Sequence, residues 1–188
     1  MRVCRWITAV FVAIVPVMVA AQTPAASAPA KPAALQRIEL PGAPGKPFPY
    51  TVEIPAGWQM RQVEGIPGVW LGPSDAQPPN DPRLVYVRLS PTPLTDPAKT
   101  VANIRAADAQ QPWSVPFIEA RQVNGIPGVL LRMDSGEGAS ARSTLVLKLP
   151  LEGGGVDFLG AAPRTEFDKL LPVYQKVFFS VRRVAAGS

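Results

Sequence analysis

Two nearly identical eleven-residue segments restrict the fold of this chain more than any other sequence feature. RQVEGIPGVWL at residues 61–71 and RQVNGIPGVLL at residues 121–131 agree at nine of eleven positions. In both, strand-forming residues flank Gly-Ile-Pro-Gly, in which proline presets φ and glycine accepts a positive φ. Each copy therefore predicts a β-hairpin that turns at this sequence. Repeat folds need at least three units, so we interpret the copies as two similar hairpins.

Other short apolar segments predict further strands. They are rich in Val, Leu and aromatic residues and are separated by clusters of Gly, Pro and Asp. Short strands at this spacing favour a mostly antiparallel sheet over a parallel one. The predicted strands are residues 50–55, 62–63, 69–71, 84–90, 117–123, 129–133, 143–149 and 156–159.

Two segments predict helices instead. Asp96 and Pro97 are an N-cap residue followed by proline at the first helical position, and they predict a helix to about residue 110 with a narrow apolar face. Pro172 lies inside the second helical segment and predicts a kink or a restart there. We expect a sheet face to pack against the apolar stripe of this second helix, which is Phe167, Leu170, Leu171, Tyr174, Val177, Phe178 and Val181.

The first residues have the layout of a cleaved secretory signal. Two arginines precede an uncharged apolar run, residues 7–21, which is shorter than the roughly 20 residues of a membrane-spanning helix. We expect cleavage after Ala21 or one residue earlier, with an uncleaved anchor as the less favoured alternative. Cys4 precedes the apolar run, which argues against a lipoprotein. The sequence therefore predicts a signal peptide at residues 1–21 and a periplasmic or secreted protein.

Residues 22–46 predict a linker, because they are rich in Ala and Pro and show no apolar periodicity. The remaining residues 47–183 are enough for one domain. Loss of two of the 19 basic residues with the signal leaves 17 against 14 acidic ones, a net charge of +3. The basic residues are scattered, which argues against nucleic-acid binding and leaves at most a weak association with an anionic membrane surface.

The residue types that the chain lacks bear directly on function. It has no histidine, and its only cysteine lies in the predicted signal. Ser-His-Asp and Cys-His catalytic arrangements and the usual zinc sites are therefore excluded, and a disulfide in the mature protein is as well. We expect no catalytic, cofactor-binding or metal-binding residue and no enzymatic activity.

Two glycine-containing segments bear a loose likeness to ligand-binding loops. Asp134, Ser135 and Glu137 resemble a calcium loop in spacing only, and a solvated turn between strands is the favoured interpretation. Residues 153–155 are a glycine run that lacks the following Lys and Ser or Thr of a phosphate loop, so we interpret them as a flexible hairpin tip.

Two pairs of side chains are weak catalytic candidates. Glu53 and Glu119 could form a carboxylate pair like that of glycosidases, although strand alternation favours solvent-facing positions for both. Ser143 and Lys148 could form a Ser-Lys dyad, but no signature surrounds them.

Several aromatic residues could line a groove for an apolar or carbohydrate ligand, because their rings offer a large contact area with a polar edge. Core packing is the favoured interpretation, above all for the first of them. These residues are Trp58, Trp70, Tyr86, Trp113 and Phe117.

The order of these elements resembles that of the PsbP-like domain superfamily, which is named for an extrinsic photosystem II subunit and includes bacterial envelope proteins. The resemblance covers residues 47–183 and rests on YTVEIPAGW at 50–58, a glycine-containing hairpin, the helix after Thr95, FLGAAP at 158–163 and FSVR at 179–182. It implies an α+β fold, an α/β/α sandwich with a central, mostly antiparallel sheet flanked by helices. The cofactor-related residues of the plant subunit are not recognisable, so it implies no site residues.

From these features together we expect an exported, non-catalytic binding or accessory module that docks onto an envelope protein or complex. The alternative is a periplasmic small-molecule or lipid carrier, which predicts an enclosed cavity facing the second helix. An enzyme ranks third and would need two close carboxylates in a deep cleft.

Overall fold

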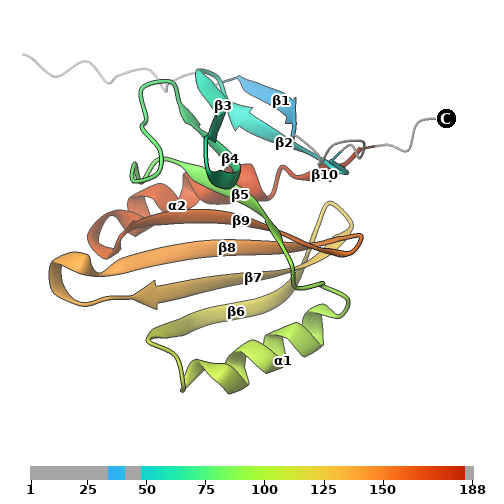
Figure 1. Ribbon diagram of the computed structural model, residues 1–188, viewed down its shortest axis with the longest axis vertical. Helices are drawn as coiled ribbons and strands as arrows, with labels where there is room; N and C mark the ends of the chain where they lie inside the picture. Colours follow the sequence, from blue (N-terminus) through green and yellow to red (C-terminus); the bar gives the residue numbers. More distant parts are fainter. Residues whose placement is uncertain (1–33, 41–47, 185–188) are drawn as a thin grey trace, which may run out of the picture. The chain divides into compact units, whose positions relative to one another are not determined.

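The computed structural model describes residues 34–40 and 48–184, which contain two antiparallel sheets (Figure 1). In the smaller sheet β2 (Tyr50–Pro55) lies between β1 (Leu35–Glu39) and β10 (Arg182–Arg183). The predicted signal peptide and most of the predicted linker lie outside the described residues. Strand β1, however, falls within the range 22–46, so the folded part begins before residue 47.

The larger sheet has seven strands in the order β3-β4-β5-β9-β8-β7-β6, and all of its neighbouring pairs are antiparallel. The eight predicted strands fall in β2 or in this sheet to within one residue, and the prediction of a mostly antiparallel sheet is confirmed. The strands are β3 (Trp58–Val63), β4 (Ile66–Pro73), β5 (Val85–Ser90), β6 (Trp113–Val123), β7 (Ile126–Ser135), β8 (Arg142–Leu151) and β9 (Gly154–Pro163).

The two similar segments form hairpins, β3–β4 and β6–β7, but the predicted position of the turn was wrong. The turns consist of the first glycine of Gly-Ile-Pro-Gly and the residue before it, at residues 64–65 and 124–125. Gly65, Asn124 and Gly125 have φ of 77°, 49° and 78° there. Two-residue hairpin turns need such positive φ values, which Asn-Gly adopts readily. Pro67 and Pro127 instead lie in strands, two residues before the next neighbouring strand begins to pair. Their missing N–H groups therefore cost that pairing nothing.

Helix α2 (Arg164–Phe178) packs on β8, β9 and β2 and continues through Pro172, so it does not restart there. Tyr174 lies against the backbone of Gly160 in β9, and its hydroxyl donates a hydrogen bond to the carbonyl oxygen of Pro82. The predicted apolar stripe supplies the buried face of the helix. Its fully buried members within the helix are Phe167, Tyr174, Val177 and Phe178, and Val181, which is also fully buried, lies beyond the end of α2.

Helix α1 (Pro97–Asp108) lies along β6 and β7. The predicted N-cap is confirmed, since the Asp96 carboxylate accepts a hydrogen bond of 3.0 Å from the Lys99 backbone N–H. In β7, Leu130 joins the core beneath α2, whereas Leu131 joins the cluster that contacts Ile104 of α1. Successive strand residues point to opposite faces, so the two helices lie on opposite faces of the sheet.

The domain is therefore α+β, as predicted. The two helices are offset across the strands of the larger sheet: α1 lies over β6 and β7, whereas α2 lies over β8 and β9. Each face of the sheet is thus covered in a different place. Neither helix of the described part is long and apolar enough to cross a membrane.

A methyl group added at Gly160 should loosen α2. An added Cβ would lie 2.4 Å from Cγ of Tyr174, and overpacking of this kind costs about 1–3 kcal/mol. We expect Gly160→Ala to lower the free energy of unfolding by about that amount in urea denaturation. The matched control Ala161→Val, on the opposite face of β9, should change it by less than about 0.5 kcal/mol. Equal effects of the two substitutions would contradict this packing.

Stability should fall in alkaline solution because of two buried tyrosines. Burial raises the pKa of Tyr174 and of Tyr50 above the usual value of 10.0. The folded protein then holds these protons to a higher pH than the unfolded chain does, so their contribution to stability is complete below pH 10 and is lost above it. Unfolding free energies measured between pH 8 and pH 11.5 should show this decline, and Tyr174→Phe should make it shallower. A decline of the same slope in Tyr174→Phe would refute the assignment to Tyr174.

Candidate functional site

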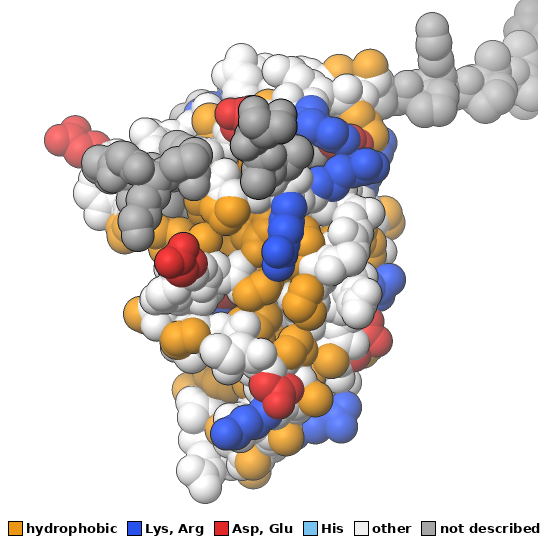
Figure 2. Space-filling view, turned by 90° about the vertical axis from the view of Figure 1, so that its right-hand side faces the viewer, with side chains coloured by type: hydrophobic (Ala, Val, Ile, Leu, Met, Phe, Trp, Pro, Cys, Tyr) orange, Lys and Arg blue, Asp and Glu red, His pale blue; other side chains and the backbone are white. Residues whose placement is uncertain are grey.

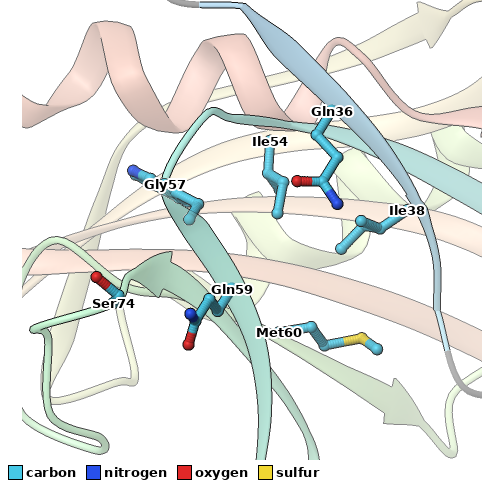
Figure 3. A pocket seen from close by; sticks show the side chains of 8 residues that line it. Gln36, Ile38, Ile54, Gly57, Gln59, Met60 and Ser74 are labelled. Atoms are coloured by element: carbon cyan, nitrogen blue, oxygen red, sulfur yellow. The ribbon is translucent and has the colours of Figure 1, made fainter.

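A groove lies at the corner where the smaller sheet meets the edge of the larger one (Figure 3). Its volume is about 560 Å³, which is within the usual range of ligand pockets. Strands β1, β2 and β3 and the segment after β4 contribute to it. The lining residues are Gln36, Ile38, Ile54, Gly57, Trp58, Gln59, Met60 and Ser74.

The groove follows from the way the chain changes sheets. After β2 the chain turns at residues 56–57, where Gly57 has φ of 82°, and continues as β3 at the edge of the larger sheet. Strand β1 pairs with β2 so that Gln36 lies opposite Ile54, and Ile38 follows on the same face. One wall of the groove is therefore β1 and the end of β2, and the other wall is β3.

The lining of the groove carries no formal charge. Ile38, Ile54 and Met60 offer apolar surface, whereas Gln36 and Gln59 offer amide groups that can donate and accept hydrogen bonds. Met60 is 40% exposed. A lining that combines neutral hydrogen-bonding groups with some apolar surface suits an uncharged ligand, and it provides neither a general acid nor a general base.

A second feature lies on the sheet face opposite α2. The buried Asp157 carboxylate, 2% exposed, accepts a 2.6 Å hydrogen bond from Lys148 Nζ and lies 3.4 Å from the guanidinium of Arg88. Next to Arg88 on the same face, Tyr86 stacks on Trp70 with ring centroids 4.3 Å apart. Both cations compensate the charge of the carboxylate, so the three side chains form an ion-pair network.

Hydrophobic side chains also gather on the face where the β8–β9 hairpin and the segment leading to α1 lie (Figure 2). Lys and Arg side chains interrupt this patch in the same view. The groove, whose lining has no charged side chain, is therefore the stronger candidate for a binding site. Across the described residues, the large hydrophobic side chains that are exposed are Leu35, Met60, Leu89, Phe117 and Val184.

The structure does not bring the weak catalytic pairs together. Ser143 and Lys148 lie on one strand at an odd spacing, so they point to opposite faces of the sheet. Ser143 accepts a hydrogen bond from Arg132 instead. Glu53 and Glu119 belong to different sheets, where each pairs with its own arginine, Arg37 and Arg121 respectively.

Both glycine-containing segments lie at turns. Asp134 is at the end of β7 and accepts a 2.9 Å hydrogen bond from Arg132, and the described residues contain no group of three or more His, Cys, Asp or Glu side chains that could hold a metal ion. The β8–β9 hairpin turns at residues 152–153, where Gly153 has φ of 77°, so the predicted hairpin tip is confirmed at Gly153, whereas Gly154 and Gly155 are buried residues of β9.

The predicted aromatic residues do not form one groove. Trp58 packs partly against the main core and also lines the groove, whereas Trp70 and Tyr86 stack on the sheet face opposite α2. Trp113 begins β6, and Phe117 is an exposed residue of the same strand. Gln36 and Ile38 were missed, because they fell in the predicted linker. The change from Ala and Pro to LQRIEL at residues 35–40 is the sequence signal that could have revealed them.

The sequence matches no protein-family model and no curated protein. The structure is similar to the solution structure of cyanobacterial PsbP (CyanoP) from Synechocystis sp. PCC 6803, with a TM-score of 0.54 and 21% identity over 86% of this chain and 100% of the other. It is also similar to the crystal structure of LpqN, which is involved in cell envelope biogenesis of Mycobacterium tuberculosis. That comparison gives a TM-score of 0.54 and 16% identity over 80% of this chain and 91% of the other. Similarity at this level of identity establishes a common fold.

Loss of the buried carboxylate should destabilise the sheet. Asp157→Ala leaves Lys148 partly buried without its partner, and we expect a loss of about 2–4 kcal/mol, near the lower end for a broken buried pair because Lys148 keeps some contact with water. Arg88→Ala removes a longer and half-exposed contact and should cost less than about 1 kcal/mol. Urea denaturation of both variants checks this, and an equal or larger loss in Arg88→Ala would contradict it.

Proposed function

Because the chain has the PsbP-like fold, we propose that it is an exported, non-catalytic accessory module that docks onto an envelope protein or complex through the groove between β1 and β3. The observation that carries the proposal is the neutral lining of this groove, which has the size of a ligand pocket. The signal-like residues 1–21 support export. The similarity to a protein involved in cell envelope biogenesis supports a location in the cell envelope.

The charges near the groove favour docking over catalysis. Arg61, the charged residue of β3, donates hydrogen bonds to the carbonyl oxygens of Pro73 and Ala76 and is thereby fixed. Glu53 is paired with Arg37. The chain also has no histidine to act as a general base near neutral pH. A groove with these surroundings can bind a partner, but it offers no group for proton transfer.

The packing beneath α2 argues against a lipid carrier. Such a carrier would need a cavity facing this helix, but Phe158, Phe167, Tyr174 and Phe178 fill the space there, each with 0% of its surface exposed. The close contact of Tyr174 with Gly160 leaves no room for an added methyl group. The open groove at the corner of the two sheets suits a protein segment better than a lipid that must be shielded from water.

Native mass spectrometry of the mature protein, tagged at its C-terminus and purified gently from the envelope fraction of its own host, tests this function. We expect a mass equal to the chain plus a second polypeptide. Met60→Arg places a charge in the groove without a partner and should lower recovery of that polypeptide at least about tenfold. The matched control Leu89→Arg changes a residue that is 55% exposed and is not part of the groove lining, and it should leave recovery unchanged.

Two results would overturn the proposal. A small added mass in place of a polypeptide would favour a small-molecule carrier. Equal loss of the polypeptide in Met60→Arg and Leu89→Arg would exclude the groove as the docking site.

A further inference from the structure

We propose that the groove binds an uncharged protein segment in extended conformation, which adds as an eighth strand of the larger sheet to the edge of β3 that no described strand pairs with. This inference rests on the proposed docking function and specifies how the partner is recognised. Main-chain hydrogen bonds would supply affinity, and the groove side chains would select the sequence.

The groove runs along the edge of β3 rather than along one of its faces. Trp58, Gln59 and Met60 are consecutive, and all three line it. Successive side chains of a strand point to opposite faces, so a pocket that all three share must run along the edge between those faces. Figure 3 shows Gln59 and Met60 on opposite sides of β3, with Met60 on the side of Gln36 and Ile38 of β1. A ligand in the groove therefore meets the backbone of β3.

The pairing of β3 with β4 identifies the backbone groups that face the groove. The Ser74 N–H donates to the Gly57 carbonyl oxygen at 3.2 Å, so this opposed pair is hydrogen-bonded. Hydrogen-bonded and non-hydrogen-bonded pairs alternate along an antiparallel ladder. The N–H and C=O groups of Gln59 and Arg61 therefore point toward β4, and those of Trp58 and Met60 point outward. Within residues 34–40 and 48–184, none of these outward groups takes part in a hydrogen bond.

The opposite edge of the same sheet is protected. On β6, the Val115 N–H donates to the Asp108 carboxylate at 2.9 Å, and the Ile118 carbonyl oxygen accepts a hydrogen bond of 3.2 Å from Arg105. Both of these partners belong to α1. Pro116 has no N–H, and a register shift interrupts the strand between Ser114 and Phe117. Proline, bulges and covering helices are the usual means of blocking an exposed edge.

Within the described residues, strand β3 has no proline and no covering helix, and its own register shift lies between Arg61 and Val63, beyond the residues that line the groove. Its sequence, WQMRQV, has no proline and one charged residue, Arg61, which binds the carbonyl oxygens of Pro73 and Ala76. A strand edge left open beside a groove is a ready template for another strand. Among the described residues, one edge of this sheet is protected and the other is left open next to a pocket, which favours the open edge for partner binding.

The lining determines the chemistry of the bound segment. A charged side chain in the groove would lose water without gaining an opposite charge, which is unfavourable. Apolar side chains can pack on Ile38, Ile54 and Met60, and small polar ones can bond to Gln36 and Gln59. The occupant is therefore an extended segment of alternating apolar and small polar residues.

A defined probe tests this mode on the purified protein. The probe is the blocked pentapeptide acetyl-Thr-Val-Thr-Val-Thr-amide, which has no charge, and the readout is the backbone amide NMR spectrum. We expect saturable shifts at β3 and slower hydrogen exchange of the Trp58 and Met60 amides, with no gain in protection at Gln59 and Arg61. Methylation of the valine nitrogens and methylation of the threonine nitrogens should affect binding differently, because the N–H groups of only one of the two residue types face β3. One methylated peptide should lose binding at least tenfold, and the other should keep it.

A pair of variants at Met60 separates the backbone from the side chain. Met60→Pro removes the outward N–H, and proline is tolerated on edge strands when its nitrogen faces outward. It should weaken peptide binding at least tenfold. Met60→Leu keeps the N–H and should stay within about threefold of the wild type, since this swap nearly conserves side-chain volume. If Met60→Pro does not fold, the two methylated peptides and the hydrogen-exchange pattern decide the question on the wild-type protein.

Three results would overturn strand addition. The first is no peptide-dependent shift at β3, and the second is equal binding of the two methylated peptides. The third is a dimer of the free protein in which the Trp58 and Met60 amides are already protected, since the occupant would then be a second copy of this chain. An envelope polypeptide that binds wild type and Met60→Pro equally would leave the docking function standing and refute strand addition. If the purified protein binds the peptide but no envelope polypeptide is recovered with it, strand addition would stand and the docking function would be refuted.

Discussion

The packing of Tyr174 against the backbone of Gly160 is the contact on which the rest of the structure depends. It seats α2 on β8 and β9, and the residues that follow the helix then fix the smaller sheet. The Ser180 hydroxyl accepts a hydrogen bond from the Glu53 N–H at 2.8 Å, which ties the end of α2 to β2. The side-chain amide of Asn124 donates to the carbonyl oxygens of Phe179 and Val181, which ties the same segment to the β6–β7 turn. The segment that follows α2 therefore connects the smaller sheet with the larger one.

This arrangement gives the two edges of the larger sheet different surroundings. Helix α1 covers β6 and satisfies outward backbone groups through Asp108 and Arg105. Strand β3 faces the smaller sheet across the groove instead. The second strand of that sheet is anchored by α2, so the groove is held by the core rather than by a loop. The neutral side chains of the groove offer no group for acid–base chemistry, and the edge of β3 is the feature on which the proposed recognition of another chain rests.

Much of the fold could be predicted from local patterns. The alternation in residues 50–55, the apolar stripe of α2 and the cap at Asp96 each depend on a few neighbouring residues, and the structure confirms all three. The hairpin turns were misplaced because Gly-Ile-Pro-Gly offers more than one turn position. The Asn-Gly pair at residues 124–125 then prevails, since its positive φ values match the twist of a two-residue hairpin. Strand β1 was missed because a single five-residue strand next to an Ala- and Pro-rich segment gives little periodicity.

The sequence by itself determined both helices, the strands other than the short β1 and β10, the antiparallel pairing of neighbours and the lack of histidine chemistry, because these depend on backbone periodicity and composition. Among the residues that line the groove, the sequence indicated only Trp58, an aromatic residue that could line a ligand groove or pack in the core. The tertiary structure alone decided that Gln36 of β1 and Gln59 of β3 would line one groove, that Asp157 would be buried between Lys148 and Arg88, and that α1 would cover one edge of the sheet. These outcomes depend on packing between segments far apart in the chain, and local patterns carry no information about which distant surface a strand edge will meet.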